Sequence, residues 1–488
     1  MRRLSALDVL CVVLIAAGLA AWTCGIRHRY FDYDELEHLY ALWRVHAGDR
    51  PFVDFFEGHP PFLWYLLAPG LPAYDLFSFP LFPLRVLTAA GHLVFLLALG
   101  RNVALSFARL ARPVSFPRAA FIVGTLVLAG NPSVIWYLVE FRLDAWPNAL
   151  LLLAIDRYRR TAAPPLRAAF ALAFVGTLTL LCTPKLALLL VLFCLCSLAA
   201  GDARGRRAAG LAAGTLAALL AGALFLRAAG LDLRLVYALC VRYHRLLGAR
   251  GGFGHGMAAA ILGQPPLVAF AAAALAGWLL VARRRLAAQP FELSVALFLV
   301  VQPIVVPFGF PQYYAPWFLL AIAFVPWLEL GLRQAPAVRR LAGTAALVLA
   351  GATLVVDLRT FLAVDQTAPV VAFNAWAHAR VPAGATVAGD VAHLPIYRRA
   401  VFYHLADSRQ PNGYTTEAAL ADLHLGELGA RMTPAAYDRE LEAGRPALIV
   451  PGPLLSPPEN EAVARYLARH RSAYGALASP AGPVELRR

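Results

Sequence analysis

The residues best suited to chemistry in this sequence lie in the acidic stretch FDYDELEH, residues 31–38. A second polar group follows in GDRPFVDFFEGHPP, residues 48–61. Carboxylates can take a proton from a hydroxyl nucleophile or bind a hard divalent cation. Two such groups on one loop could surround a single cleft. The candidates for chemistry or loop support are Asp34, Glu35, Glu37, His38, Asp54, Glu57 and His59.

A structural explanation of the acidic stretch is also available. Asp32 followed by Glu35 resembles a helix capping box, and each carboxylate near a helix N-terminus contributes about 0.3–1 kcal/mol. Apolar side chains then recur at helical spacing, which predicts an amphipathic helix on the outer membrane surface. The apolar face holds Leu36, Leu39, Tyr40 and Trp43, and the opposite face holds Asp34, Glu37, His38 and Arg44. A cap does not explain four carboxylates and a histidine beside a membrane, so we favour a functional role.

The elements that must position these residues are membrane helices. The chain has 488 residues, of which 60% are hydrophobic and 15% are charged, and a bilayer needs about 20 apolar residues per helix. The pattern predicts a polytopic α-helical membrane protein with about eleven transmembrane helices. The expected spans are 5–25, 84–105, 118–138, 144–157, 168–182, 184–200, 209–229, 259–282, 291–309, 314–331 and 340–357.

Arginine clusters between the spans orient the chain. Positive residues prefer the cytoplasmic side, which places the N-terminus inside and the C-terminus outside. The clusters are Arg2/Arg3, Arg101/Arg109/Arg112, Arg157/Arg159/Arg160, Arg204/Arg206/Arg207, Arg283/Arg284/Arg285 and Arg333/Arg339/Arg340. Because the net charge of +15 is explained by these loops, we expect no nucleic-acid partner.

The predicted domains are a transmembrane part, residues 1–357, and an extracytoplasmic α/β domain, residues 358–488. The first loop, residues 26–83, is also expected outside. In the tail, GATVAGD and PALIVPG have the composition of strands between turns, and EAVARYLARH has a helical pattern. The first apolar run is interpreted as a retained helix, because no small-residue cleavage site follows it.

The acidic pair after the first span, followed by G-x-x-P-[FY]-x-D-F-F-x-x-H-P-P, resembles the GT-C glycosyltransferases. The closer resemblance is to bacterial relatives of protein O-mannosyltransferases and to the lipid A aminoarabinose transferase. It is most specific in the first loop. It implies a sugar transferase of the bacterial cytoplasmic membrane that uses a polyprenyl-phosphate sugar. Asp34 then corresponds to the catalytic base with Glu35 beside it, and direct displacement would invert the anomeric centre.

Cations are needed to bind the donor phosphate. Lys185, the only lysine of the chain, lies at an outward turn where relatives often carry one; the alternative is a lysine that extends to the membrane interface. Arg142 either faces the donor or pairs with Asp144. The weaker candidates are Arg242, His244 and Arg245, which could instead form a basic surface helix on anionic lipid, and Tyr313, whose default place is the aromatic belt.

The expected partners are a polyprenyl-phosphate sugar, membrane lipid, and an acceptor lipid, glycan or protein. We expect no obligatory cofactor. A weak divalent-metal site at Asp34, Glu35 and Asp54 is the alternative. A hexosyl and a pentosyl donor are both compatible with the sequence.

Two other functions compete with this hypothesis. A ligase or polymerase of lipid-linked glycans would use the loop at about 230–258, but it would leave the acidic first loop unexplained. A transporter would need ionisable residues within its spans or symmetric interrupted helices, and the sequence shows neither.

Overall fold

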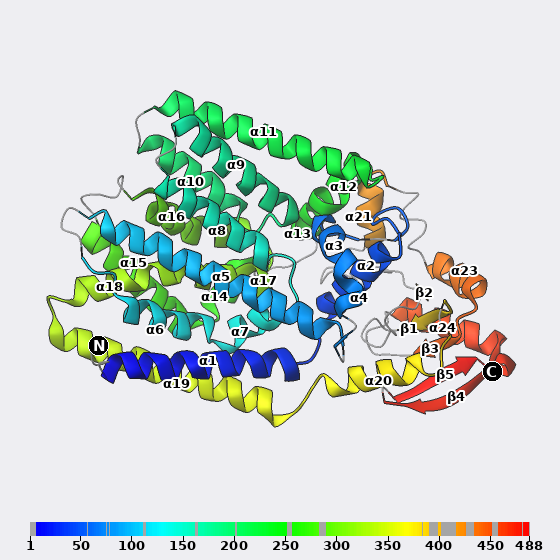
Figure 1. Cartoon of the computed structure of the whole chain (residues 1–488). Coiled ribbons are helices and arrows are strands. Elements are labelled where there is room, and N and C mark those ends of the chain that lie inside the picture. The colour runs from blue at the N-terminus through cyan, green and yellow to red at the C-terminus, as the bar shows by residue number, and fades with distance from the viewer. Residues whose placement is uncertain are drawn as a thin grey trace. The chain divides into compact units, whose positions relative to one another are not determined.

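The computed structural model describes most of the chain, and its secondary structure is largely helical (Figure 1). The described residues are 6–55, 57–74, 76–77, 79–110, 114–161, 164–200, 203–250, 256–282, 289–382, 384–389, 399–401, 416–425, 434–450, 457–480 and 482–487. Arg2, Arg3, Arg112 and Arg283–Arg285 of the predicted arginine clusters lie outside them, as do residues 251–255 of the loop at 230–258.

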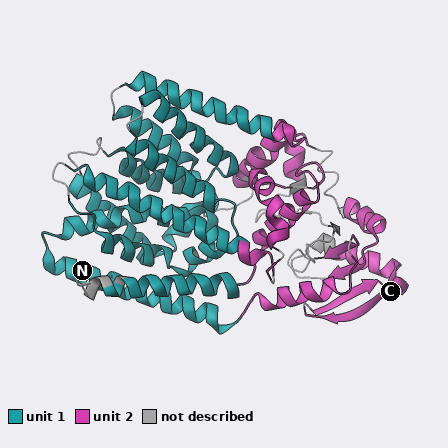
Figure 2. Cartoon of the chain, viewed as in Figure 1, with its two compact units in different colours: residues 1–29, 84–225, 254–364 teal, residues 30–83, 226–253, 365–488 magenta. Residues whose placement is uncertain are grey.

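The chain forms two compact units, each built from segments that are distant in sequence (Figure 2). Unit 1 comprises Met1–Arg29, Leu84–Phe225 and Gly254–Val364. Unit 2 comprises Tyr30–Pro83, Leu226–Phe253 and Asp365–Arg488. The first loop therefore belongs to the same unit as the C-terminal segment.

Unit 1 consists of helices around one apolar core. Many of its helices, and α20 of unit 2, have a proline in their first turn, where the missing N–H is not needed for the helix. The helices are α1 (Ala6–His28), α5 (Leu81–Ala108), α6 (Arg118–Ala129), α7 (Pro132–Val139), α8 (Ala145–Arg160), α9 (Pro165–Cys182), α10 (Ala187–Ala199), α11 (Arg204–Ala228), α14 (Gly256–Leu262), α15 (Pro265–Ala282), α16 (Pro290–Val305), α17 (Pro311–Ala321), α18 (Val325–Leu332) and α19 (Pro336–Ala363).

The predicted spans fall on these helices. Among the described residues, six helical stretches are long and apolar enough to cross a membrane. They are Leu81–Ala108, Pro165–Cys182, Arg204–Ala228, Pro265–Ala282, Pro311–Leu332 and Pro336–His378. The span expected at 118–138 is divided into α6 and α7, because α6 ends at its C-cap Gly130. A polytopic helical fold is thus confirmed, whereas the count of eleven spans stays a prediction.

Unit 2 begins with the helices of the first loop and of the segment after α11. The first loop forms α2 (Tyr33–His46), α3 (Phe62–Leu67), η1 (Ala68–Gly70) and α4 (Leu71–Tyr74). The later segment forms α12 (Leu233–Tyr237), the π-helical η2 (Ala238–Tyr243) and α13 (His244–Arg250). Helix α21 (Thr416–Asp422) places Leu420 in one buried apolar cluster with Phe52 and Leu239, so three distant segments share a core.

The C-terminal segment contains a five-stranded mixed sheet in the order β2-β1-β3-β5-β4. Strand β1 is parallel to β2 and β3, whereas β5 is antiparallel to β3 and β4. Apolar side chains of α23 and α24 pack with Ala388 and Ile449. Its elements are α20 (Ala368–His378), β1 (Thr386–Gly389), β2 (Arg399–Val401), α23 (Pro434–Gly444), β3 (Leu448–Val450), α24 (Pro457–Arg469), β4 (Tyr474–Ser479) and β5 (Gly482–Arg487). Strands occur in GATVAGD and PALIVPG as predicted; the extracytoplasmic location of this segment stays a prediction.

Candidate functional site

The acidic stretch begins helix α2 with the predicted capping box. The Asp32 side chain accepts a hydrogen bond from the Asp34 backbone N–H at 3.1 Å, and Glu35 accepts one from the Asp32 backbone N–H at 2.9 Å. Glu35 is fully buried, so its carboxylate is committed to the cap. Asp34 is half-buried in the first turn. The two members of the acidic pair therefore have different surroundings.

Helix α2 is not a surface helix with a solvated polar face. Leu36 and Leu39 are buried as expected, but His38 and Arg44 on the opposite face are buried too. The prediction of a membrane-surface helix was wrong on this point, because polar side chains of this face contact the rest of the first loop.

Arg44 ties α2 to the loop that follows it. Its guanidinium forms an ion pair with Asp49 and donates a hydrogen bond to the Asp54 carbonyl at 3.1 Å. The Asp54 side chain accepts from the Arg50 backbone N–H at 2.7 Å. Burial raises the pKa of Asp54, but the hydrogen bonds and charge of Arg50 outweigh it and lower the pKa below its usual value. Asp54 thus supports the loop.

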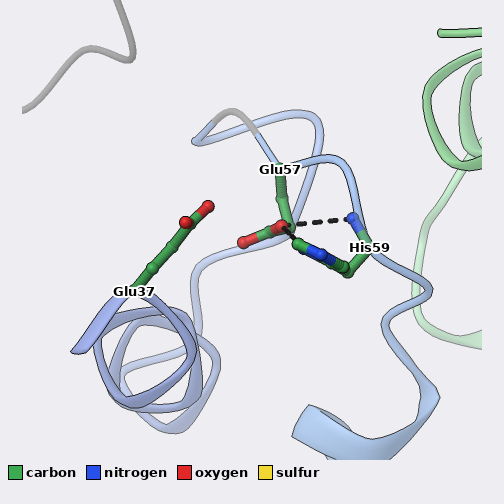
Figure 3. A group of neighbouring side chains, drawn as sticks. All are labelled: Glu37, Glu57 and His59. Atoms are coloured by element: carbon green, nitrogen blue, oxygen red, sulfur yellow. Dashed lines mark hydrogen bonds and ion pairs between the residues drawn. The ribbon is translucent and has the colours of Figure 1, made fainter. Parts of the chain in front are cut away.

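Glu57 is the centre of the second polar group. Its side chain is 2% exposed, and its Oε1 accepts three hydrogen bonds: from the Gly58 N–H at 2.9 Å, the His59 N–H at 3.1 Å and His59 Nδ1 at 2.7 Å. Glu37 points from α2 toward this pair (Figure 3). One oxygen or nitrogen from each of Glu37, Glu57 and His59 lies within 4.8 Å of the others. These three side chains could hold a divalent cation, a different set from the one expected from the sequence.

Three histidines lie next to one another in unit 2. The ring centroids of His38 and His59 are 4.8 Å apart, and those of His59 and His244 are 5.8 Å apart. His244 Nε2 is 2.7 Å from the Gly58 carbonyl oxygen. A carbonyl only accepts, so Nε2 of His244 carries the proton. His244 thereby fixes the glycine between Glu57 and His59.

The neighbouring imidazoles have opposite pKa shifts. Burial lowers the pKa of His244 to about 4, and the charge of His59 adds to this effect. Burial also disfavours the charged form of His59, but its hydrogen bond with Glu57 and the carboxylates of Glu57, Glu37 and Asp34 outweigh burial and raise its pKa. At neutral pH, His244 is therefore neutral, whereas the surroundings of His59 stabilise its charged form more than water stabilises that of a free imidazole.

Unit 1 contains a separate buried polar group around Lys185. Its Nζ lies 2.5 Å from Oδ2 of Asp144, which also accepts a hydrogen bond from the Tyr137 hydroxyl at 2.7 Å. The amine lies 5.5 Å from the ring centroid of Tyr313, within the range of a cation–π contact. The Lys185 side chain is 18% exposed. Lys185 thus points to a buried carboxylate.

Arg142 does not pair with Asp144. Its Nε donates to Oε2 of Glu140 at 2.7 Å, and the other oxygen of Glu140 forms an ion pair with Arg29. All three side chains of this triad are buried. Glu140 thus joins the two guanidinium groups of Arg29 and Arg142. Glu140 was not among the candidates, although it stands two residues before Arg142.

The remaining basic candidates are in unit 2. Arg242 and Arg245 are exposed, and together with Tyr237 and Asp422 they line a pocket of about 380 Å³. The structure thus divides the candidates into two groups. Unit 2 holds Asp34, Glu35, Glu37, His38, Asp54, Glu57, His59, Arg242, His244 and Arg245, and unit 1 holds Arg142, Asp144, Lys185 and Tyr313.

The chain has the fold of ArnT, and the resemblance predicted from the first loop is confirmed at the level of the fold. Two crystal structures of ArnT from Cupriavidus metallidurans resemble it over nearly their full length. The apo structure has a TM-score of 0.60 and 16% identity, covering 99% of this chain and 98% of ArnT. The structure of ArnT bound to undecaprenyl phosphate has a TM-score of 0.61 and 15% identity, covering 97% of each chain. No protein-family model and no curated protein matches the sequence.

Proposed function

We propose that the chain is a membrane glycosyltransferase that moves a sugar from a polyprenyl-phosphate donor to an acceptor. The reaction would take place on the outer face of a bacterial cytoplasmic membrane. The observation that supports this most strongly is the ArnT fold over the whole chain, because one of the two ArnT structures binds undecaprenyl phosphate. The sugar is a hexose or a pentose, and the acceptor is an envelope lipid, glycan or protein.

In this proposal, Asp34 is the general base. It takes the proton of an acceptor hydroxyl while the hydroxyl oxygen attacks the anomeric carbon of the donor. The bond from that carbon to the phosphate oxygen breaks, and polyprenyl phosphate leaves with the bonding electrons. Attack from the face opposite the leaving group inverts the anomeric centre.

The surroundings of the two carboxylates favour Asp34 over Glu35. Glu35 is fully buried and already accepts a hydrogen bond within the cap. Asp34 is half-buried and interacts electrostatically with His59, whose pKa is raised. A nearby imidazolium favours the ionised form of a carboxylate, which is the form that a base needs.

Each unit has cations suited to the donor phosphate. In unit 1, Lys185 lies against Tyr313, and Arg29 and Arg142 both form ion pairs with Glu140. In unit 2, Arg242 and Arg245 line one pocket. We assign the phosphate first to Lys185 and Arg142, because both are less exposed than Arg242 and Arg245, and a cation that is partly shielded from water attracts an anion more strongly. The proposal requires no metal; a cation held by Glu37, Glu57 and His59 would be an addition to it.

The test uses purified protein in lipid vesicles with a panel of polyprenyl-phosphate sugars and extracted envelope lipids and glycans. Release of polyprenyl phosphate is followed with and without a chelator. Asp34→Asn should reduce release by about 10²–10⁴-fold, the usual contribution of a general base. The matched control is Asp232→Asn, which changes an exposed cap of α12 to a residue that caps equally well.

Equal release by the wild type and Asp34→Asn would exclude Asp34 as the base. Release of polyprenyl phosphate from none of the donors in the panel would count against this donor class. Loss of activity with the chelator, and its recovery on addition of a divalent cation, would show that the reaction needs a metal.

A further inference from the structure

An apolar slot of about 520 Å³ lies among α1, α5 and α6 in unit 1. Helices α1 and α6 pack closely, whereas the backbone of α5 stays farther from both. Leucines of α1 and α5 that line the slot are strongly exposed, 50% for Leu19, 44% for Leu93 and 60% for Leu97. The walls are almost entirely apolar, with aromatic rings from Trp22, Phe116 and Phe121. Such a surface in a membrane helix bundle is suited to a hydrocarbon chain.

The length of the slot corresponds to one leaflet. Its lining residues extend along α5 from Leu93 to Ala104 and along α6 from Arg118 to Ala129. At a rise of about 1.5 Å per residue, each wall is roughly 16 Å long. Half of a bilayer core is about 15 Å. The slot therefore matches a single acyl chain that starts at one membrane interface, and it is too short for a polyprenyl chain.

One end of the slot is positively charged. Arg118 lines it and is exposed, and within the described part of the chain no acidic side chain pairs with it. Arg101 also lines this end; it forms an ion pair with Asp156 at 2.9 Å, but Arg160 binds the same carboxylate at 2.6 Å. One carboxylate thus balances two guanidinium groups, which leaves excess positive charge. Arg101 belongs to the clusters that the positive-inside rule assigns to the cytoplasm.

We propose that this slot binds an anionic phospholipid of the cytoplasmic leaflet. One acyl chain lies between α5 and the α1–α6 pair, and the phosphate contacts Arg118 and Arg101. This site is separate from the candidate residues of the transferase reaction, and it does not depend on the proposed function.

The experiment measures lipid retention by the full chain in detergent, using native mass spectrometry. The probes are phosphatidylglycerol, phosphatidylcholine and undecaprenyl phosphate. Arg118→Gln removes the charge, and Leu97→Trp fills the slot from an exposed position. The matched controls are Arg206→Gln, an exposed arginine of α11, and Leu195→Trp, a 58% exposed leucine of α10.

The wild type should retain phosphatidylglycerol over phosphatidylcholine by about fivefold per arginine contact, as expected for a basic residue at an anionic membrane surface. Arg118→Gln should reduce the preference for phosphatidylglycerol about fivefold. Leu97→Trp should reduce the retention of both phospholipids, and the two control variants should retain both like the wild type. The proposal is overturned if Arg118→Gln and Leu97→Trp retain both lipids like the wild type. It is also overturned if undecaprenyl phosphate displaces phosphatidylglycerol and depends on the same two residues.

Discussion

Acidification should destabilise unit 2 through one imidazole, that of His244. Its pKa is about 4 in the folded chain, because burial and the charge of His59 disfavour protonation, whereas a histidine in an unfolded chain has a pKa of about 6.5. Between these values the unfolded state binds a proton that the folded state does not. The contribution of His244 to the free energy of unfolding is therefore complete above pH 6.5, and it is lost as the pH falls toward 4. At about 1.36 kcal/mol per pH unit, lowering the pH from 6.5 to 5 reduces the free energy of unfolding by at most about 2 kcal/mol.

The matched variant is His244→Gln. A glutamine amide can still donate to the Gly58 carbonyl, but it stays uncharged over this range. We would measure thermal unfolding by intrinsic fluorescence from pH 8 to pH 5 in the same detergent. Between pH 6.5 and 5, the melting temperature of the wild type should fall by about 4–8 °C more than that of the variant. A loss of 1 kcal/mol in the free energy of unfolding lowers the melting temperature by about 2–4 °C for a unit of this size.

An equal dependence of melting temperature on pH in the wild type and in His244→Gln would refute this reasoning.

His59 supplies a second check, because its pKa shift has the opposite sign. Its folded pKa is raised, so its stabilising charge is present below pH 6.5 and is lost as the pH rises through the folded pKa. His59→Gln should flatten the alkaline side of the profile, and it should also reduce the acid loss by removing the charge next to His244.

Two further predictions concern packing and charge in unit 1. Asp144→Asn leaves the Lys185 amine without its carboxylate and should cost about 3–5 kcal/mol, whereas the double variant Asp144→Asn/Lys185→Met should recover part of that loss. Additive losses in the unfolding midpoints would contradict this pairing. At Gly277 an added Cβ would lie 2.6 Å from Leu328 Cα, so Gly277→Ala should lower stability by about 1–3 kcal/mol. Gly343→Ala in α19 meets no atom within 4 Å and should gain up to about 1 kcal/mol; similar melting shifts for both alanine variants would show that the close approach is not the cause.

Local patterns in the sequence predict the features that depend on neighbouring residues. The capping box needs only Asp32 and Glu35, three positions apart, and it forms as expected. Apolar runs predict the helices because the requirement for length and hydropathy is local. Strands β1 and β3 follow from short apolar segments between turn residues.

Pairings between distant segments could not be predicted in the same way. Lys185 and Asp144 are 41 positions apart, and each lies at a turn whose position depends on the packing of whole helices. The Arg44 guanidinium binds the Asp54 carbonyl, so the loop folds back onto α2. The helical pattern of α2 by itself therefore places His38 and Arg44 on a solvated face, although both are buried. For Arg142, the sequence suggested Asp144 as the ion-pair partner. In the structure its partner is Glu140, two residues before it rather than two residues after it.

The single lysine of the chain has a practical consequence. Apart from the α-amino group, Lys185 supplies the chain's one primary amine, and it is held between a carboxylate and two tyrosine rings. Isotope labelling of lysine would therefore give a spectrum with one side-chain ammonium resonance, which needs no assignment. That resonance is a natural reporter of the charge state inside the membrane part, and a phosphate that replaces Asp144 as the partner of the amine would shift it directly.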